Sequence, residues 1–272
     1  MNYNSRVSSL YRNSWFHVPH PVNNPSLRLF CFAYAGGSAA VFRDWYKSLP
    51  SNVEVCSIQL PGRGVRFREK AITCSVELIN SLVTAIEPYL DVPFAFFGHS
   101  MGAQVAFELT RALRREKKAQ PQHIFVSGRK APHLPMIRRP IHALPEAEFL
   151  TEIRRLNGTP SEAWEHPELI SLMSPILRAD VKLVETWKFD TEAPLNLPIT
   201  ALGGFNDEGV PRAQLESWQE HTSHPVDVKM FSGDHFFINS AQSDVLAVLN
   251  AKLSPKVSLP VHAMRQLSRV GA

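Results

Sequence analysis

A serine bracketed by glycines, between two apolar segments of different periodicity, constrains this chain most. Residues 93–109 read PFAFFGHSMGAQVAFEL. The run before the glycines is short and aromatic, which predicts a buried strand. After the glycines, the spacing of Val105, Ala106 and Leu109 predicts a helix. Strand, G-x-S-x-G and helix form the layout of a nucleophile elbow, with Ser100 on a sharp turn. The alternative is a glycine-bracketed turn whose serine does no chemistry.

Strand patterns alternate with helix patterns along most of the chain. Apolar runs predict further strands at 27–32, 53–60, 123–127, 199–202 and 226–231. Amphipathic spacing predicts helices at 42–49, 79–90 and 243–253. The alternation indicates one α/β domain over 1–272, with a mostly parallel central sheet and helices on both faces. Together with the elbow, this pattern predicts an α/β-hydrolase fold.

The alternation breaks between about 134 and 194, where no convincing strand pattern occurs. Helical patterns cover about 145–156 and 167–188 instead. An insertion of this kind between core strands predicts a helical lid over the site. The last residues, from about 255 to 272, are expected to form a weakly ordered basic tail.

Two late loops carry candidate partners for the serine. A serine hydroxyl needs a base to take its proton, and the base needs an acid to fix its tautomer. In this fold the chain order is Ser, then Asp or Glu, then His, with the partners in loops after late strands. His235 follows the last predicted strand and is the candidate base. Asp207 follows the penultimate strand and is the candidate acid. The catalytic prediction is therefore Ser100, Asp207 and His235.

Four other acidic residues compete with Asp207. Asp180 and Asp190 precede the penultimate strand, so they come too early in the chain order. Asp234 is too close to the histidine in sequence to reach its ring. Glu208 is adjacent to Asp207, which is preferred for its position at the strand end.

Other histidines have weaker claims to a role. His99 adjoins the serine, but neighbouring residues on a sharp turn point apart, so we expect a structural role. His221 and His224 have helical spacing and could form half of a metal site. No third ligand is apparent near them, which favours a solvated surface and no metal.

Two backbone amides are candidates for an oxyanion hole. One belongs to Met101, the residue after the serine, and the other to a loop after an early strand. Ala35 occupies that loop, immediately before Gly36 and Gly37, which let the backbone turn its amide inward.

Composition restricts the remaining classes of function. The net charge is +4, and no basic stretch is interleaved with aromatic residues, so nucleic-acid binding is not expected. No segment offers about 18 continuous apolar residues, and the N-terminus lacks an apolar signal region. Cys31 and Cys56 lie in apolar runs and no CxxC pair occurs, so we expect buried thiols in a reducing compartment. These features predict a cytoplasmic protein that does not enter a membrane.

Several motifs in order resemble those of the type II thioesterases of nonribosomal peptide and polyketide assembly lines. The matching segments are 32–38 (FAYAGGS), 59–64 (QLPGRG), 98–103 (GHSMGA), 127–132 (SGRKAP), 177–180 (LRAD) and 233–237 (GDHFF). The elbow is common to many hydrolases, whereas LPGRG and SGR-x-AP are far more particular. The matching segments extend over nearly the whole chain.

The resemblance implies a reaction and places the family's residues on this sequence. The nucleophile falls on Ser100, the acid on Asp207, the base on His235, and the oxyanion amides on Ala35 and Met101. The implied reaction is hydrolysis of acyl thioesters on the phosphopantetheine arm of acyl or peptidyl carrier proteins, which removes wrong or stalled acyl groups. The resemblance implies no cofactor, and we expect a monomer whose partners are carrier domains.

Carrier proteins are usually acidic, so basic loop residues near the expected mouth could dock them. The candidates are Arg63, Arg66, Arg68, Arg129, Lys130, Arg138 and Arg139. Simple solvation of these side chains is an equally good interpretation.

Three other functions use the same scaffold. An esterase or lipase would act on free small esters with the same triad. A transferase would pass the acyl group to an alcohol or amine. A scaffold that binds the carrier without catalysis belongs to a different class, and the intact triad order argues against it.

Overall fold

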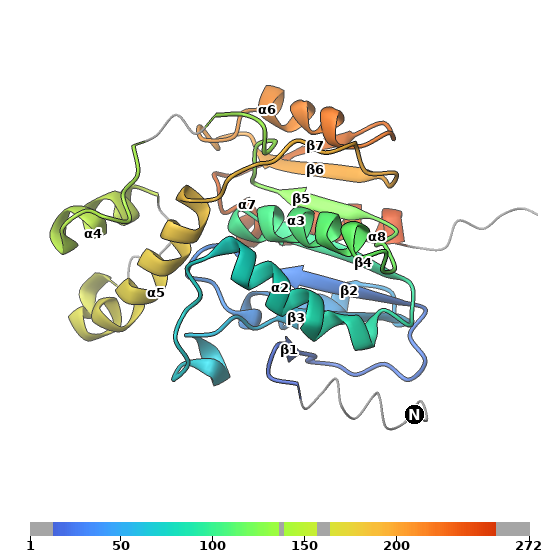
Figure 1. Cartoon of the computed structure of the whole chain (residues 1–272), viewed down its shortest axis with the longest axis horizontal. Coiled ribbons are helices and arrows are strands. Elements are labelled where there is room, and N and C mark those ends of the chain that lie inside the picture. The colour runs from blue at the N-terminus through green and yellow to red at the C-terminus, as the bar shows by residue number, and fades with distance from the viewer. Residues whose placement is uncertain (1–12, 136–138, 157–163, 254–272) are drawn as a thin grey trace, which may run out of the picture.

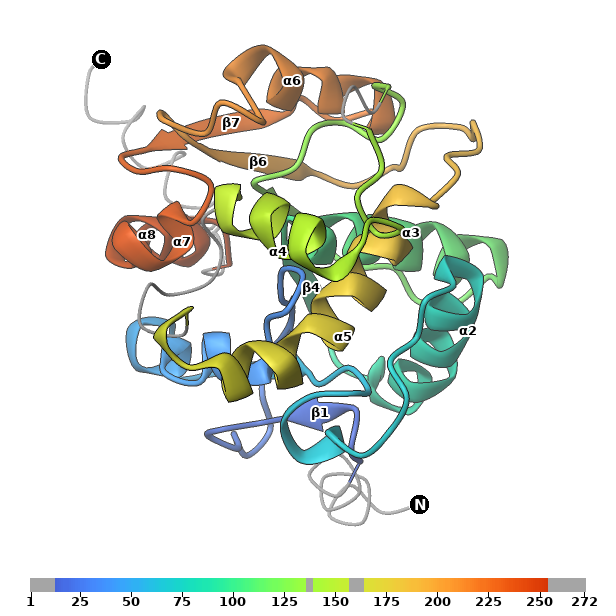
Figure 2. The same ribbon diagram turned by 90° about the vertical axis from the view of Figure 1, so that its left-hand side faces the viewer.

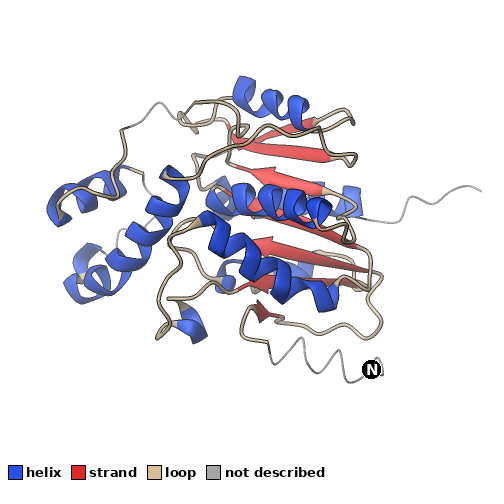
Figure 3. Ribbon diagram, in the orientation of Figure 1, coloured by secondary structure: helices blue, strands red, loops and turns tan. Residues whose placement is uncertain are grey.

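A seven-stranded sheet forms the centre of the protein (Figures 1 and 3). The computed structural model describes residues 13–135, 139–156 and 164–253. The strand order is β1-β3-β2-β4-β5-β6-β7, and every neighbouring pair is parallel except β1 with β3. The strands are β1 (Phe16–His17), β2 (Leu27–Phe32), β3 (Val53–Ile58), β4 (Phe94–His99), β5 (Ile124–Ser127), β6 (Ile199–Gly204) and β7 (Asp227–Phe231). The predicted α/β class and mostly parallel sheet are confirmed.

Helices cover both faces of the sheet. They are α2 (Ser75–Ile86), α3 (Met101–Arg115), α4 (Glu146–Arg155), α5 (Pro167–Glu185), α6 (Arg212–Glu216), α7 (Phe237–Ser240) and α8 (Gln242–Leu253). Helices α2 and α3 lie in front of the sheet in Figure 1, whereas α7 and α8 lie behind it. In the described part of the chain, no helix is both long and apolar enough to cross a membrane.

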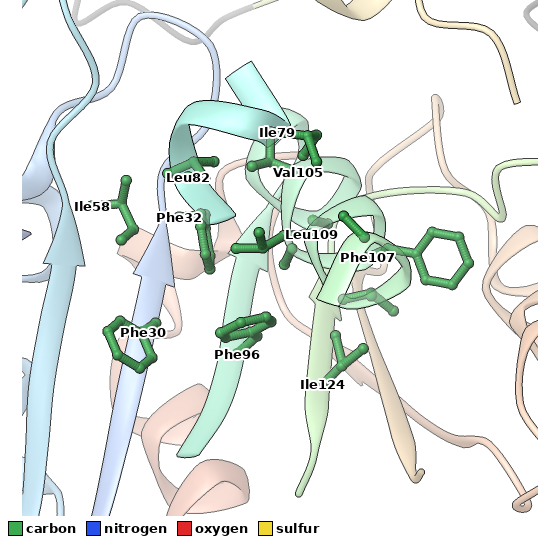
Figure 4. Packing of buried hydrophobic residues seen from close by; sticks show 14 of the residues in the cluster. Phe30, Phe32, Ile58, Ile79, Leu82, Phe96, Val105, Phe107, Leu109 and Ile124 are labelled. Carbon is green, nitrogen blue, oxygen red and sulfur yellow. The ribbon is translucent and has the colours of Figure 1, made fainter. Parts of the chain in front are cut away.

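Alternation along the strands divides the core into two layers. Phe30 and Phe96 point to the side of α2 and α3, where they pack with Leu109 (Figure 4). Leu29 and Phe97, their neighbours in sequence, point to the opposite side and pack against α8. Because successive strand side chains face opposite sides, both positions must be apolar in a doubly covered sheet. Truncating such a phenylalanine to alanine costs about 3–5 kcal/mol.

The predicted helix at 42–49 is wrong in type. Two short 3₁₀-helices, Ala39–Phe42 and Trp45–Ser48, occupy this segment. The pattern identified burial correctly, because Phe42 and Trp45 are fully enclosed. The segment lies between the Ser38 cap and Pro50, however, and 3₁₀ turns are common in pieces this short. The sequence patterns also missed β1, which is only two residues long.

The segment between β5 and β6 contains the two expected helices, α4 and α5. No strand occurs in its described residues. Both helices lie beyond the carboxyl ends of the strands, as the views in Figures 1 and 2 show. They share a small hydrophobic cluster of their own, built on Phe149, Ile153, Leu177 and Val181. The predicted tail at 255–272 lies outside the described residues.

Candidate active site

Ser100 occupies a strained turn between β4 and α3. Its φ of 54° and ψ of −112° lie in a region that side-chain-bearing residues rarely adopt. A Cβ on Gly98 would lie 2.1 Å from the Gly102 oxygen, and a Cβ on Gly102 would lie 2.0 Å from the Phe32 oxygen. Both positions therefore require glycine. The Ser100 amide donates to the Ser127 carbonyl at 2.7 Å, which ties the turn to β5.

The three predicted catalytic residues meet at the carboxyl ends of β4, β6 and β7. The His235 Nε2 atom lies 3.0 Å from Ser100 Oγ, and its Nδ1 atom lies 2.6 Å from Asp207 Oδ2. Asp207 is buried, and its other carboxylate oxygen accepts the Gly209 amide at 3.1 Å. A carboxylate at Nδ1 favours the tautomer that leaves Nε2 as an acceptor toward the serine. The arrangement can deprotonate the Ser100 hydroxyl.

The rival acids have other surroundings. The Asp234 carboxylate accepts the Phe236 amide at 2.8 Å, as part of the turn that carries the histidine. Glu208 and Asp190 are exposed. Asp180 is buried in α5, where it pairs with an arginine rather than a histidine.

His99 is fully buried next to His235, in agreement with its expected structural role. Its Nδ1 atom lies 2.8 Å from Ser127 Oγ, and its ring centroid lies 5.2 Å from that of His235. Burial lowers the pKa of His99 well below its usual range, and the neighbouring His235 lowers it further. A neutral His99 therefore adds no charge to the site. Gly128 has a φ of +58°, and a Cβ there would lie 2.7 Å from the His99 ring.

The two amides predicted for an oxyanion hole lie at the start of α3 and in the turn after β2. Met101 is the first residue of α3, where a helix has no internal acceptor for an amide. Ala35 lies in the turn after β2, which the Gly37 amide closes by donating to Tyr34 at 2.9 Å. Within the described ranges, neither the Ala35 nor the Met101 amide donates to a protein acceptor. Both amides can therefore donate to a substrate oxygen.

A buried ion pair fastens this turn to α5. Arg63 donates to both carboxylate oxygens of Asp180, at 2.5 and 2.7 Å. The same carboxylate accepts the Gly36 amide at 2.7 Å, and the Arg63 guanidinium also donates to the Gly37 carbonyl at 3.3 Å. One carboxylate therefore joins the loop after β3, the turn that holds Ala35, and the insertion helix. The sequence patterns did not reveal this pairing.

These contacts correct part of the docking prediction. Arg63 and Arg66 are buried, so they are not free to dock a partner. Arg66 donates to Glu69 and stacks on Trp15, with its guanidinium carbon 4.1 Å from the ring centroid. Both guanidinium groups are instead paired with carboxylates of this chain, Asp180 and Glu69.

The other basic candidates differ in exposure. Arg68 and Arg139 are exposed, Arg129 is half-buried, and Lys130 donates to the Pro135 carbonyl at 2.6 Å. Arg138 lies outside the described residues. Docking by the exposed pair stays a prediction.

The solvated surface predicted around His221 is also wrong. His221 is buried against Phe107 and Trp218, and its Nε2 atom lies 2.8 Å from His133 Nδ1. Burial lowers the pKa of His221 to about 4, and His133 contributes to the shift. His224 is half-buried and lies 3.2 Å from the Asn196 side-chain oxygen. Over the described ranges, no three His, Cys, Asp or Glu side chains could jointly hold a metal.

The sheet order, the elbow and the Ser-His-Asp alignment define an α/β-hydrolase fold. The chain belongs to the thioesterase domain family, whose model matches residues 27–253. The resemblance found in the motifs is thereby confirmed.

Characterised relatives cover nearly the whole chain. Linear gramicidin dehydrogenase LgrE of Brevibacillus parabrevis is 45% identical over 242 residues, which span 88% of this chain and 92% of LgrE. Gramicidin S biosynthesis protein GrsT of Aneurinibacillus migulanus is 41% identical over 249 residues, spanning 90% and 97%. The name of LgrE denotes a redox enzyme, whereas this sequence contains no G-x-G-x-x-G fingerprint of dinucleotide binding.

Solved thioesterase structures match this fold as well. The type II thioesterase BorB from the borrelidin biosynthetic cluster matches with a TM-score of 0.79 and 31% identity. The match covers 87% of this chain and 96% of the BorB chain.

Proposed function

We propose that this protein is a serine thioesterase that removes acyl groups from the phosphopantetheine arm of carrier proteins. Its role would be editing in nonribosomal peptide, polyketide or fatty acid synthesis. The observation that carries the proposal is the Ser100–His235–Asp207 alignment on the fold of a thioesterase family member. The printed names of GrsT and BorB, a gramicidin S biosynthesis protein and a type II thioesterase, support the biosynthetic setting.

The first half of the reaction transfers the acyl group to the serine. His235 Nε2 takes the hydroxyl proton as Ser100 Oγ bonds to the thioester carbonyl carbon. The carbonyl oxygen becomes an oxyanion and accepts hydrogen bonds from the backbone N–H groups of Ala35 and Met101. By precedent, each such donor lowers the activation free energy by about 2.7–4 kcal/mol. The carbon–sulfur bond then breaks, and the proton on His235 goes to the departing thiolate. The products are the free carrier thiol and acyl-Ser100.

The second half returns the enzyme to its starting state. His235 takes a proton from water, whose oxygen bonds to the acyl carbon. The same amides hold the second oxyanion. Collapse breaks the bond to Ser100 Oγ, which regains its proton from His235, and the free acid leaves. Asp207 accepts a hydrogen bond from the Nδ1–H group throughout and stabilises the imidazolium ion.

We also propose that α4 and α5 form a lid over the site. Their position beyond the strand ends supports this role, as does the bond from the Gly36 amide to Asp180 in α5. A lid that limits water would determine whether the acyl group goes to water or to another acceptor. The monomeric state, the absence of a cofactor and the cytoplasmic location stay predictions.

The test is release of acyl groups from loaded carriers. Purified protein and the Ser100→Ala variant receive acetyl- and longer acyl-carrier thioesters beside simple esters of the same acids. Carrier hydrolysis by the parent, lost by several orders of magnitude in Ser100→Ala, is expected on triad precedent. Rapid ester hydrolysis without release from any carrier would favour the esterase alternative. Carrier binding without turnover would favour the scaffold, and acyl transfer to an added alcohol or amine would favour the transferase.

A further inference from the structure

The guanidinium of Arg129 contacts α3, the helix that begins directly after the nucleophile, and the reaction described above gives it no role. Arg129 follows β5 by two residues, and β5 holds the Ser100 amide through Ser127. The guanidinium Nη2 atom donates to the side-chain oxygen of Gln104 in α3. Gln104 lies one helical turn beyond the serine. Its backbone N–H donates to the Ser100 carbonyl oxygen at 3.5 Å. One turn of a helix is about 5.4 Å, so Arg129 contacts α3 about one turn from the serine.

Arg129 differs from the other enclosed arginines in its partner. In the described part of the chain, every other buried or half-buried arginine donates to a carboxylate. Those pairs are Arg28 with Glu54, Arg63 with Asp180, Arg66 with Glu69, Arg111 with Glu108, Arg114 with Glu192, and Arg178 with Glu146. Among the described residues, Arg129 has the neutral amide of Gln104 and no carboxylate within ion-pair distance.

An enclosed cation without an anion is energetically unfavourable. Burial lowers the pKa of Arg129 to about 10, which is the direction expected when a charge loses water without gaining a counter-charge. Proteins usually pair charges that are partly removed from water, and Arg129 is half-buried without such a partner among the described residues. The guanidinium can recover this free energy by binding an anion that arrives with a ligand.

The backbone around Arg129 is held in place before any ligand binds. Its carbonyl accepts the Trp218 indole N–H at 2.8 Å. On either side, the Gly128 amide donates to Leu202 at 2.8 Å and the Ala131 amide donates to Gln214 at 3.3 Å. A fixed guanidinium loses less entropy on binding, and its planar donors match the two oxygens of a carboxylate or phosphate.

We propose that Arg129 binds an anionic oxygen group of the thioester substrate. This inference rests on the proposed function and specifies part of the substrate. The group is either a carboxylate on the acyl chain or the phosphate of the phosphopantetheine arm. Both groups have the same recognition chemistry, so substrates that differ by one group separate them.

The experiment compares one neutral thioester with two anionic ones. Acetyl-pantetheine is neutral, acetyl-phosphopantetheine adds the phosphate, and succinyl-pantetheine adds a carboxylate. The variants are Arg129→Gln and Arg129→Lys, and Arg212→Gln is the matched control because Arg212 is exposed in α6 and pairs with Glu216. A charge-assisted contact is worth about 1.5–3 kcal/mol, so Arg129→Gln is expected to raise KM for one anionic substrate by roughly 10- to 150-fold.

Comparing the effect of Arg129→Gln on the three substrates shows which group Arg129 binds. The anionic substrate that loses affinity in Arg129→Gln identifies the source, while kcat for acetyl-pantetheine stays unchanged and Arg129→Lys recovers part of the affinity. Equal losses on neutral and anionic substrates, or no loss on either, would overturn the proposal. Binding of phosphopantetheine, pantetheine and succinyl-pantetheine to Ser100→Ala, by calorimetry, tests the same contact without turnover. A protein that hydrolyses no thioester yet prefers an anionic ligand through Arg129 would refute the proposed function and keep this inference.

Discussion

Removing the Asp180 carboxylate tests how much its contacts with Arg63 and Gly36 stabilise the protein. In Asp180→Ala, the Arg63 guanidinium keeps its buried position but loses both of its 2.5 and 2.7 Å contacts. The Gly36 amide loses its acceptor in the same change. Arg63 is only 5% exposed, so water cannot replace the missing partner without opening the loop.

The expected loss of stability has two sources, the unpaired Arg63 guanidinium and the unpaired Gly36 amide. Breaking a buried ion pair from one side costs about 3–5 kcal/mol, because the other charge stays buried. In a domain of this size, that loss lowers Tm by roughly 6–20 °C. Replacing both partners by apolar residues, Arg63→Met with Asp180→Leu, removes the stranded charge. The double variant is expected to recover part of the loss, because about 1–3 kcal/mol remains for the unpaired Gly36 amide.

The assay is urea unfolding with a matched ion-pair control. Glu216 pairs with Arg212 in α6, and the two side chains are 54% and 57% exposed. Surface pairs of this kind contribute about 0–1 kcal/mol, so Glu216→Ala should change the free energy of unfolding little. If Asp180→Ala costs no more than Glu216→Ala, the Arg63–Asp180 pair does not stabilise the contact between α5 and the core.

Two further predictions concern catalysis and pH. Asp207→Asn keeps the hydrogen bond to His235 but favours the wrong tautomer of the imidazole. The kcat for a thioester should therefore fall by about 10⁴-fold, while circular dichroism shows an unchanged fold. Retention of more than a tenth of kcat would contradict the role of Asp207. Burial holds the pKa of both His123 and His221 at about 4, below the ordinary value of 6.5. Below pH 6.5 the unfolded chain therefore binds more protons than the folded protein does. The free energy of unfolding is highest above this pH and falls between pH 6.5 and 4, by on the order of 1–2 kcal/mol per histidine at pH 5. Urea midpoints at pH 7.5 and 5 measure the fall, His221→Phe should make it shallower, and equal midpoints would refute the linkage.

Local sequence patterns predicted the elbow because its signals are local. The strand before Ser100, the glycines around it and the helix after it are all encoded within one segment. Asp207 and His235 could be placed because the carboxyl ends of parallel strands meet at one edge of a sheet. The chain order of the fold then selected among the acids and histidines.

Features that depend on distant contacts could not be predicted in this way. Arg63 and Asp180 are 117 positions apart, and nothing near either residue indicates that they pair. His221 was expected to be solvated because no third metal ligand is apparent near it and His224 in the sequence. Its burial depends on Phe107 in α3, which the tertiary fold brings against it.

The proposed function depends above all on the activation of Ser100 as a nucleophile by His235 and Asp207. The most direct test is covalent labelling with an alkyl phosphonate reagent, read by intact mass and peptide mapping. We predict one phosphonyl group per chain, on the peptide containing Ser100, with labelling abolished in Ser100→Ala and greatly slowed in His235→Ala. An unlabelled native protein, or a label on another residue that persists in Ser100→Ala, would contradict the account.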